Sequence, residues 1–238
     1  TDVFAALLVN DYVNGGEADI EKVLATGFSH GFGAVPGNRE LVEWLREYNH
    51  GRAPADRVRF YGFDAPVEYS GAPSPRGALS AAGDFLPAAM RPHSFDDIDL
   101  LLGQDPDWTN PAAMFEPAAS VGNSDQARAL RIIADDLASV LRRAAPVLRP
   151  ADPGGYDLAL AHARTAVGLL RYHAAMASSA PDRIGTLLSL RAEMMAENLL
   201  AVVAQEQRRG PILLFAHNAH LLRVPSDMPV NGDVVSWG

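Results

Sequence analysis

Residues 211–220 read PILLFAHNAH, and this stretch decides the fold class that the sequence predicts. Its first part, PILLFA, is a short continuous apolar run, as expected of a strand that is buried on both faces of a sheet. His217, Asn218 and His220 follow this run directly. Because the carboxyl ends of such strands open into a ligand crevice, we expect the imidazole of His217 to reach a substrate there.

A second strand is predicted over Arg57–Phe63, where the sequence RVRFYGF alternates and carries β-branched and aromatic residues. Asp64 follows this strand, so its carboxylate should lie at the same sheet edge as His217 if both strands point the same way. An aspartate in this place either orients a histidine or caps a turn, and the sequence leaves both roles open.

Helical spacing of apolar residues surrounds these strands with predicted helices. Asn14-Gly15-Gly16 should end the first helix, and Pro146 and Pro150 should stop the fourth. The predicted helices cover residues 3–13, 17–26, 38–49, 124–145 and 156–178, and a last one runs from Ser179 to Arg208-Arg209-Gly210. The sequence therefore predicts a single α/β domain over residues 1–238, with a parallel-rich sheet flanked by helices and a long-helix elaboration over about 75–180.

Composition excludes several classes of function. The 238 residues, 48% of them hydrophobic, are enough for one large domain, and the net charge of −9 argues against nucleic acid or an anionic membrane as a partner. Without cysteine, the chain has no disulfide, thiolate nucleophile or Cys-ligated metal. We find neither a signal peptide nor an apolar run of transmembrane length, so we expect a cytoplasmic protein. Lys22 is the sole lysine beside many Arg, Ala, Gly and Pro residues, a bias typical of GC-rich bacterial genomes.

The two histidines of the AHNAH motif allow three interpretations. His217 lies where a catalytic imidazole would meet a substrate, but it also lies where a residue caps a short helix. His217 and His220 are three positions apart, which is also a metal-ligand spacing, although no obvious third ligand accompanies them.

Polar residues interrupt the apolar stripe of the last long helix. Arg191 and Asn198 lie on that stripe, and Glu197 lies beside Asn198. Because a buried guanidinium without a partner is costly, we expect Arg191 to lie beside a carboxylate, either in a structural salt bridge or in the substrate site. His30, in the glycine-rich stretch FSHGFG, is either a residue at the mouth of a pocket or a solvated loop residue.

Five stretches in order resemble the erythromycin esterase family. They are NDYVNGGEADIEKVLATGF, NRELVEWLREYN, VRFYGFD, RAEMMAENLL and FAHNAHLLRVP. The resemblance implies a hydrolase that cleaves an ester or macrolactone, without metal or cofactor, through water activated by a histidine. It implies His217, Asp64, Arg191 and Glu197 as catalytic residues, and it implies that His30, Asn198, Asn218 and His220 bind the substrate.

One family segment has no counterpart in this sequence. Members carry an N-terminal Gly-Glu-x-x-His-Gly segment that supplies the general base, and no such segment occurs between residues 1 and 238. We therefore expect a partial family domain whose partner is a small ester or lactone. The alternative is a catalytically incomplete module that binds its ligand in the same cleft without turnover. The oligomeric state is not predicted.

Overall fold

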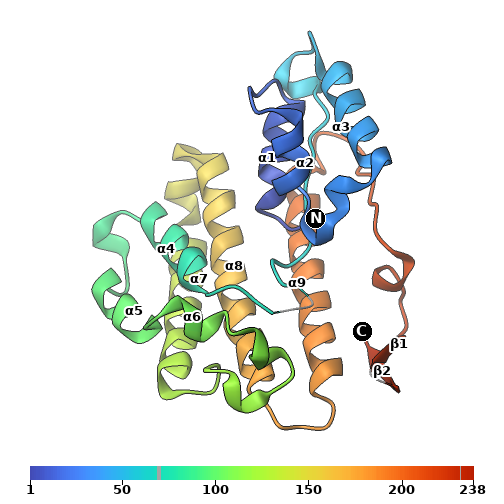
Figure 1. Ribbon diagram of the computed structural model, residues 1–238. Helices are drawn as coiled ribbons and strands as arrows, with labels where there is room; N and C mark the ends of the chain where they lie inside the picture. The colour runs from blue at the N-terminus through green and yellow to red at the C-terminus, as the bar shows by residue number, and fades with distance from the viewer. Residues whose placement is uncertain (69–70, 231) are drawn as a thin grey trace. The chain divides into compact units, whose positions relative to one another are not determined.

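The computed structural model describes residues 1–68, 71–230 and 232–238 (Figure 1). By its internal contacts the chain divides into two compact units. Unit 1 comprises Thr1–Pro66 with Met195–Phe215, and unit 2 comprises Val67–Met194 with Ala216–Gly238. The long helix α9 (Arg183–Glu206) contributes its first half to unit 2 and its second half to unit 1.

Unit 1 is a small helical cluster. Its elements, besides the second half of α9, are α1 (Ala5–Val13), α2 (Ile20–Thr26), the 3₁₀ helix η1 (Ser29–Ala34), α3 (Pro36–Asn49) and η2 (Pro54–Asp56). Gly15, at φ +106°, lies just beyond the end of α1, a backbone conformation that glycine adopts without strain. Helices α1, α2 and α3 lie together (Figure 1), and the core between them is formed by Val9, Val13, Val23, Val42 and Leu45.

Unit 2 is built around two long helices, α7 and α8, which run side by side (Figure 1). Helices α4 and α5 pack against this pair, and apolar side chains such as Leu79, Leu130, Leu137 and Leu170 fill the space between them. Besides the first half of α9, its elements are α4 (Arg76–Phe85), η3 (Ala88–Met90), α5 (Phe95–Leu102), α6 (Asp105–Trp108), η4 (Pro111–Met114), η5 (Pro117–Ala119), α7 (Asp125–Ala151), α8 (Pro153–Met176), η6 (Asn218–His220), β1 (Ser226–Val230) and β2 (Asp233–Trp237).

The predicted helices are confirmed, but the predicted stop at Pro146 is wrong. Helix α7 continues through Pro146 and Pro150 and ends only at Ala151. Its last turns pack against α8, with Leu148 buried, and this contact offsets the backbone hydrogen bonds that the prolines remove. Asp152 then caps α8, because its side chain accepts a hydrogen bond from the backbone N–H of Gly155.

The predicted α/β fold with a parallel-rich sheet is wrong. In the described residues the paired strands are β1 and β2, which form an antiparallel hairpin that joins Ser226 with Trp237 at one end and Val230 with Asp233 at the other. Neither predicted strand forms. Arg57–Phe63 and Pro211–Ala216 are irregular, and Leu213 and Phe215 are 94% and 88% exposed instead of buried.

The two segments fail as strands because a strand exists only where a neighbour pairs with it. Local sequence supplies β-branched and aromatic residues, but the stability of a strand comes from cross-strand hydrogen bonds and packing. For Arg57–Phe63, the nearest strand-like contact is one isolated parallel bridge between Asp2 and Asp64. Helices, by contrast, satisfy their hydrogen bonds within one segment, so their prediction depends less on distant partners.

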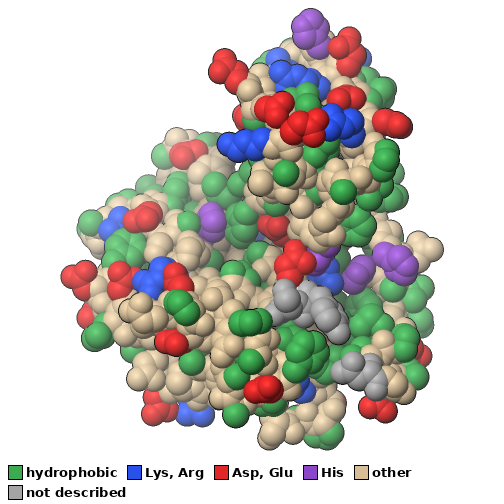
Figure 2. All heavy atoms as spheres, in the orientation of Figure 1, with side chains coloured by type: hydrophobic (Ala, Val, Ile, Leu, Met, Phe, Trp, Pro, Cys, Tyr) green, Lys and Arg blue, Asp and Glu red, His purple; other side chains and the backbone are tan. Residues whose placement is uncertain are grey.

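No helix among the described residues is long and apolar enough to cross a bilayer. On the face drawn in Figure 2, acidic and basic side chains are interspersed with hydrophobic ones. Exposed apolar residues include Trp44 and Tyr48 of α3, whose rings stack with their centroids 5.3 Å apart.

A buried histidine lies in the core of unit 2. His173 of α8 is 1% exposed, its ring meets that of Trp108 edge-on, and its Nε2 lies 2.9 Å from the carbonyl oxygen of Pro73. Burial lowers the pKa of His173, and the hydrogen bond to Pro73 opposes this effect without cancelling it.

We expect the free energy of unfolding to fall as the pH drops below about 6.5, the ordinary pKa of histidine. The unfolded chain binds the proton first, so the contribution of His173 is complete above that pH and is lost below it, by at most about 1.4 kcal/mol per pH unit. Urea denaturation at about pH 7.5 and about pH 5.5 measures the loss. His173→Gln is the control, because glutamine can keep the bond to Pro73 without titrating. An equal loss in both proteins contradicts the assignment.

Candidate active site

The extended segment Val58–Phe63 of unit 1 is held by asparagine side chains. Asn49 is 2% exposed, its Nδ2 donates to the carbonyl of Val58 over 2.8 Å, and its Oδ1 accepts from the Val58 N–H over 2.8 Å. Asn10 of α1 accepts from the N–H of Phe60 over 2.9 Å. These amides satisfy backbone groups that a neighbouring strand would otherwise satisfy.

The far end of this segment is fixed more tightly. Asn198 of α9 donates to the carbonyl of Phe63 over 3.3 Å, and the N–H of Asp64 donates to the carbonyl of Thr1 over 3.1 Å. The chain passes Asp2 so closely that a Cβ on Gly62 would lie 2.0 Å from the Asp2 carbonyl oxygen. Asp64 therefore leaves the segment in one defined place, and its side chain is almost fully buried.

The carboxylate of Asp64 lies against the imidazole of His30. Nε2 of His30 and Oδ2 of Asp64 are 3.1 Å apart, and the side chains are 21% and 9% exposed. The other oxygen, Oδ1, accepts from the N–H of Ala65 over 2.8 Å. The rings of Phe32 and His30 meet edge-on, with their centroids 6.4 Å apart. A buried carboxylate thus fixes the orientation of a partly exposed histidine.

His30 adopts a strained backbone conformation. Its φ of 55° and ψ of 24° lie in the left-handed region, and it is the non-glycine residue with positive φ among those the structure describes. Such a conformation costs about 1–3 kcal/mol and persists only where surrounding contacts determine it. Here the contact with Asp64 holds the imidazole of His30. The preceding residue, Ser29, is held by hydrogen bonds to Thr1 and Asp2.

Sequence analysis left open whether Asp64 orients a histidine or caps a turn, and it did not identify His30 as a partner of Asp64. The two residues are 34 positions apart, and the local signal at His30 was only its place between serine and glycine in FSHGFG. Histidine is among the non-glycine residues that adopt a positive φ most often, and glycine adopts one without strain. The His30-Gly31 pair is therefore compatible with two successive left-handed residues, which is the signal in the sequence for a constrained loop.

The predicted site residues are distributed over both units. His30, Asp64, Glu197 and Asn198 belong to unit 1, and Arg191, His217, Asn218 and His220 belong to unit 2. Asn198 is buried, whereas Glu197 on the same helix is exposed. Arg191 is partly buried. Burial raises the pKa of Tyr172, and the positive charge of Arg191 lowers it by a smaller amount.

His217 is exposed and occupies the N-cap of η6. Its Nδ1 accepts a hydrogen bond of 3.2 Å from the N–H of Ala219, so in the neutral ring the proton lies on Nε2. The local geometry is therefore the capped helix start that the sequence allowed, and it makes the outer ring nitrogen a hydrogen-bond donor. His220 is partly buried against Trp237, with the ring centroids 5.1 Å apart. Within the described residues no group of three metal-ligating side chains accompanies this pair.

A second polar cluster of unit 1, which sequence analysis missed, surrounds the carboxylate of Glu206. Tyr61 donates to Oε1 over 2.7 Å, Arg59 donates to Oε1 over 2.9 Å, and Arg209 donates to Oε2. Burial raises the pKa of Glu206. The hydrogen bonds from Tyr61 and Arg209 and the charges of both arginines lower it by more, so the pKa lies below its ordinary value. Arg59 and Tyr61 are two positions apart in the extended segment, so both side chains lie on one side of it, and their hydrogen bonds to Glu206 hold the end of α9.

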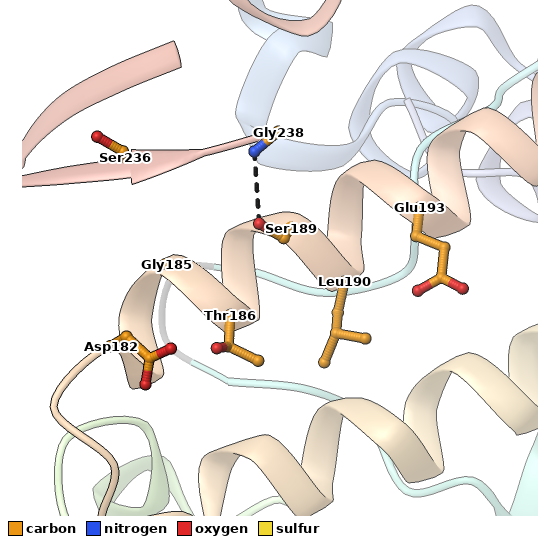
Figure 3. Close-up of a pocket in the computed structure, with 8 residues that line it drawn as sticks. All are labelled: Asp182, Gly185, Thr186, Ser189, Leu190, Glu193, Ser236 and Gly238. Carbon is orange, nitrogen blue, oxygen red and sulfur yellow. Dashed lines mark hydrogen bonds between the residues drawn. The ribbon is translucent and has the colours of Figure 1, made fainter. Parts of the chain in front are cut away.

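A pocket of about 450 Å³ in unit 2 lies between α9 and the hairpin (Figure 3). Figure 3 shows the hydroxyl of Ser189 directed at the N–H of Gly238, which donates to it over 3.4 Å. None of the predicted site residues lines this pocket. Its lining consists of Asp182, Gly185, Thr186, Ser189, Leu190, Glu193, Ser236 and Gly238.

We expect Asn49→Ala to lower the free energy of unfolding by about 2–4 kcal/mol. The substitution removes three hydrogen bonds, to Val13 and to both backbone groups of Val58, and leaves their partners without the amide. Urea denaturation measures the change. Asn38→Ala, on the same helix, is the matched control because it removes one exposed hydrogen bond to Phe32. Equal effects of the two substitutions would show that the buried amide has no special role.

A model of the erythromycin esterase family matches residues 1–233. Among solved structures the chain is similar to a protein from Bacillus cereus, with a TM-score of 0.59 and 15% sequence identity, over 85% of this chain and 45% of that one. The chain thus spans less than half of that relative, and the likeness shows the fold alone. No curated protein matches. Since the family match covers nearly every residue, the chain belongs to the erythromycin esterase family.

Proposed function

We propose that this chain is part of a hydrolase that cleaves an ester or macrolactone bond with water activated by a histidine, without a metal ion. The observation that carries the proposal is the family match over residues 1–233. An ester hydrolase needs a base for the water and hydrogen-bond donors for the negative charge that develops on the carbonyl oxygen. The chain offers exposed and partly exposed imidazoles for both tasks.

The proposal gives His217 direct contact with the substrate. Its ring is exposed, and the cap to Ala219 fixes its orientation. In the neutral form Nε2–H can donate to a carbonyl oxygen, an interaction that strengthens as that oxygen becomes negative. The cationic side chain of Arg191 stabilises the same negative charge on the carbonyl oxygen. The remaining proposed site residues are the catalytic Asp64 and Glu197 and the substrate-binding His30, Asn198, Asn218 and His220.

Substitution of His217 tests this function. We expect His217→Asn to lower kcat/KM by at least about 10²-fold, because the side-chain oxygen of asparagine can still cap η6 but the imidazole is lost. The purified protein is incubated with p-nitrophenyl butyrate and with a macrolide lactone, and mass spectrometry detects the addition of one water. His50→Asn is the matched control, since His50 is also exposed.

Three outcomes count against the proposal. An unchanged rate in His217→Asn removes this histidine from the mechanism. Binding of the lactone without any hydrolysed product favours the alternative of a binding module without turnover. Loss of activity on chelation, restored by a divalent metal, contradicts a metal-independent reaction.

A further inference from the structure

The side chains of α3 form stripes of distinct chemistry along the helix. Successive residues of an α-helix are about 100° apart around its axis, so positions spaced by three and four residues form one stripe. The buried stripe, which includes Val42 and Leu45, packs in the core with α1. The neighbouring stripe is exposed and apolar, and it consists of Leu41, Trp44 and Tyr48. The stripe beyond it, the glutamate stripe, consists of the exposed Glu40, Glu43 and Glu47.

The apolar stripe holds its large side chains in a fixed arrangement. Leu41, Trp44 and Tyr48 are 42%, 58% and 38% exposed. The rings of Trp44 and Tyr48 stack with an interplanar angle of 28°. The guanidinium of Arg52 lies 4.0 Å from the centroid of the Tyr48 ring, and Arg52 Nε donates to the Tyr48 carbonyl over 2.7 Å. Because the stack is already ordered, binding to it costs less conformational entropy than binding to mobile side chains.

The composition of this stripe is typical of protein–protein interfaces. Tryptophan, tyrosine and arginine are enriched among the few residues that carry most of the binding free energy at such interfaces. Contiguous apolar side chains left in water often mark an interaction site. The other two tryptophans of the chain, Trp108 and Trp237, are buried, as is usual for a side chain of this size. The exposed stack therefore has the features of a docking surface.

The glutamate stripe determines the charge of the partner. Arg46 of α3 donates to backbone carbonyls of unit 1. Arg39 pairs with Glu21 and, over 3.5 Å, with Glu43, so one arginine is shared between two carboxylates. The three carboxylates of the stripe thus carry an excess of negative charge beside the exposed aromatic rings. A partner that covers the rings meets this charge, and electrostatic complementarity requires lysine or arginine there.

We infer that the apolar stripe of α3 docks an amphipathic basic helix of a partner protein, with apolar partner residues on Trp44 and partner lysines or arginines beside the glutamate stripe. A helix fits because Leu41, Trp44 and Tyr48 repeat at the spacing of three and four residues at which two helices interlock their side chains. A strand does not fit, since the backbone groups of a helix pair within it and offer no edge for strand addition. A second copy of this chain would bring the same glutamates and a net charge of −9, so like charges oppose self-association. None of these residues belongs to the proposed hydrolytic site.

Two synthetic peptides test the charge and the shape of the partner. Both are helical, with leucine along one face, and the positions beside the leucines are lysine in one peptide and glutamate in the other. We expect the lysine peptide to bind the purified protein and to shield tryptophan fluorescence from quenching by acrylamide, because Trp44 is the exposed one of the three tryptophans. Isothermal titration calorimetry gives the affinities. The glutamate peptide should bind at least about 10-fold more weakly.

Trp44→Ala locates the binding on α3. We expect this substitution to weaken binding of the lysine peptide by about 10-fold or more, with little change in the thermal midpoint, because an exposed side chain adds little to stability. Ile132→Ala is the matched control and should leave binding unchanged, since Ile132 of α7 is also an exposed apolar residue of a helix. The double variant Glu40→Lys, Glu47→Lys should reverse the preference, so that the glutamate peptide binds more tightly than the lysine peptide.

Four results overturn the inference. Failure of the lysine peptide to bind the wild type contradicts it directly. Equal affinity of this peptide for the wild type and for Trp44→Ala means that charge alone attracts the peptide. An unchanged preference in the charge-reversed double variant removes the glutamate stripe from recognition. A dimer in analytical ultracentrifugation that Trp44→Ala dissociates shows that the apolar stripe binds a second copy of the chain.

Discussion

Asparagine side chains make the hydrogen bonds to Val58–Phe63 that a neighbouring strand would otherwise make, and the geometry of unit 1 depends on these bonds. A carboxamide carries both a donor and an acceptor, so Asn49 can pair with the N–H and the carbonyl of Val58 at once. An extended backbone without such partners would lose several hydrogen bonds on burial. The amides come from α1, α3 and α9, so three helices together determine where Asp64 lies.

That constraint gives the His30–Asp64 pair its chemical character. Asp64 is covered because the segment before it is fixed, and a covered carboxylate interacts with an imidazole more strongly than a solvated one does. The pair in turn holds a loop whose backbone would otherwise relax. The pair His93–Asp136 of unit 2 has a similar distance, but both of its side chains are more exposed, so distance alone does not show how firmly a carboxylate holds an imidazole. The cluster at Glu206 anchors the other end of the same segment to α9.

The predicted helices followed directly from apolar spacing. The spacing in 38–49 and 156–178 places α3 and α8 within a few residues of their observed bounds. The error at Pro146 arose because local rules treat proline as a stop, whereas packing of Leu148 against α8 carries α7 onward. The strand predictions failed for a related reason, since PILLFA has the composition of a buried strand but no partner to pair with in the described chain.

The sequence by itself determined the helical segments and the family to which the chain belongs. It also identified two polar features, Asp64 at the end of the extended segment and the AHNAH motif. These features are local or ordered along the chain, so pattern and spacing reveal them. The tertiary structure alone decided that Asp64 meets His30. Contacts between residues 34 positions apart depend on how the whole chain packs, because loop closure and burial reward them only after the helices between them are in place.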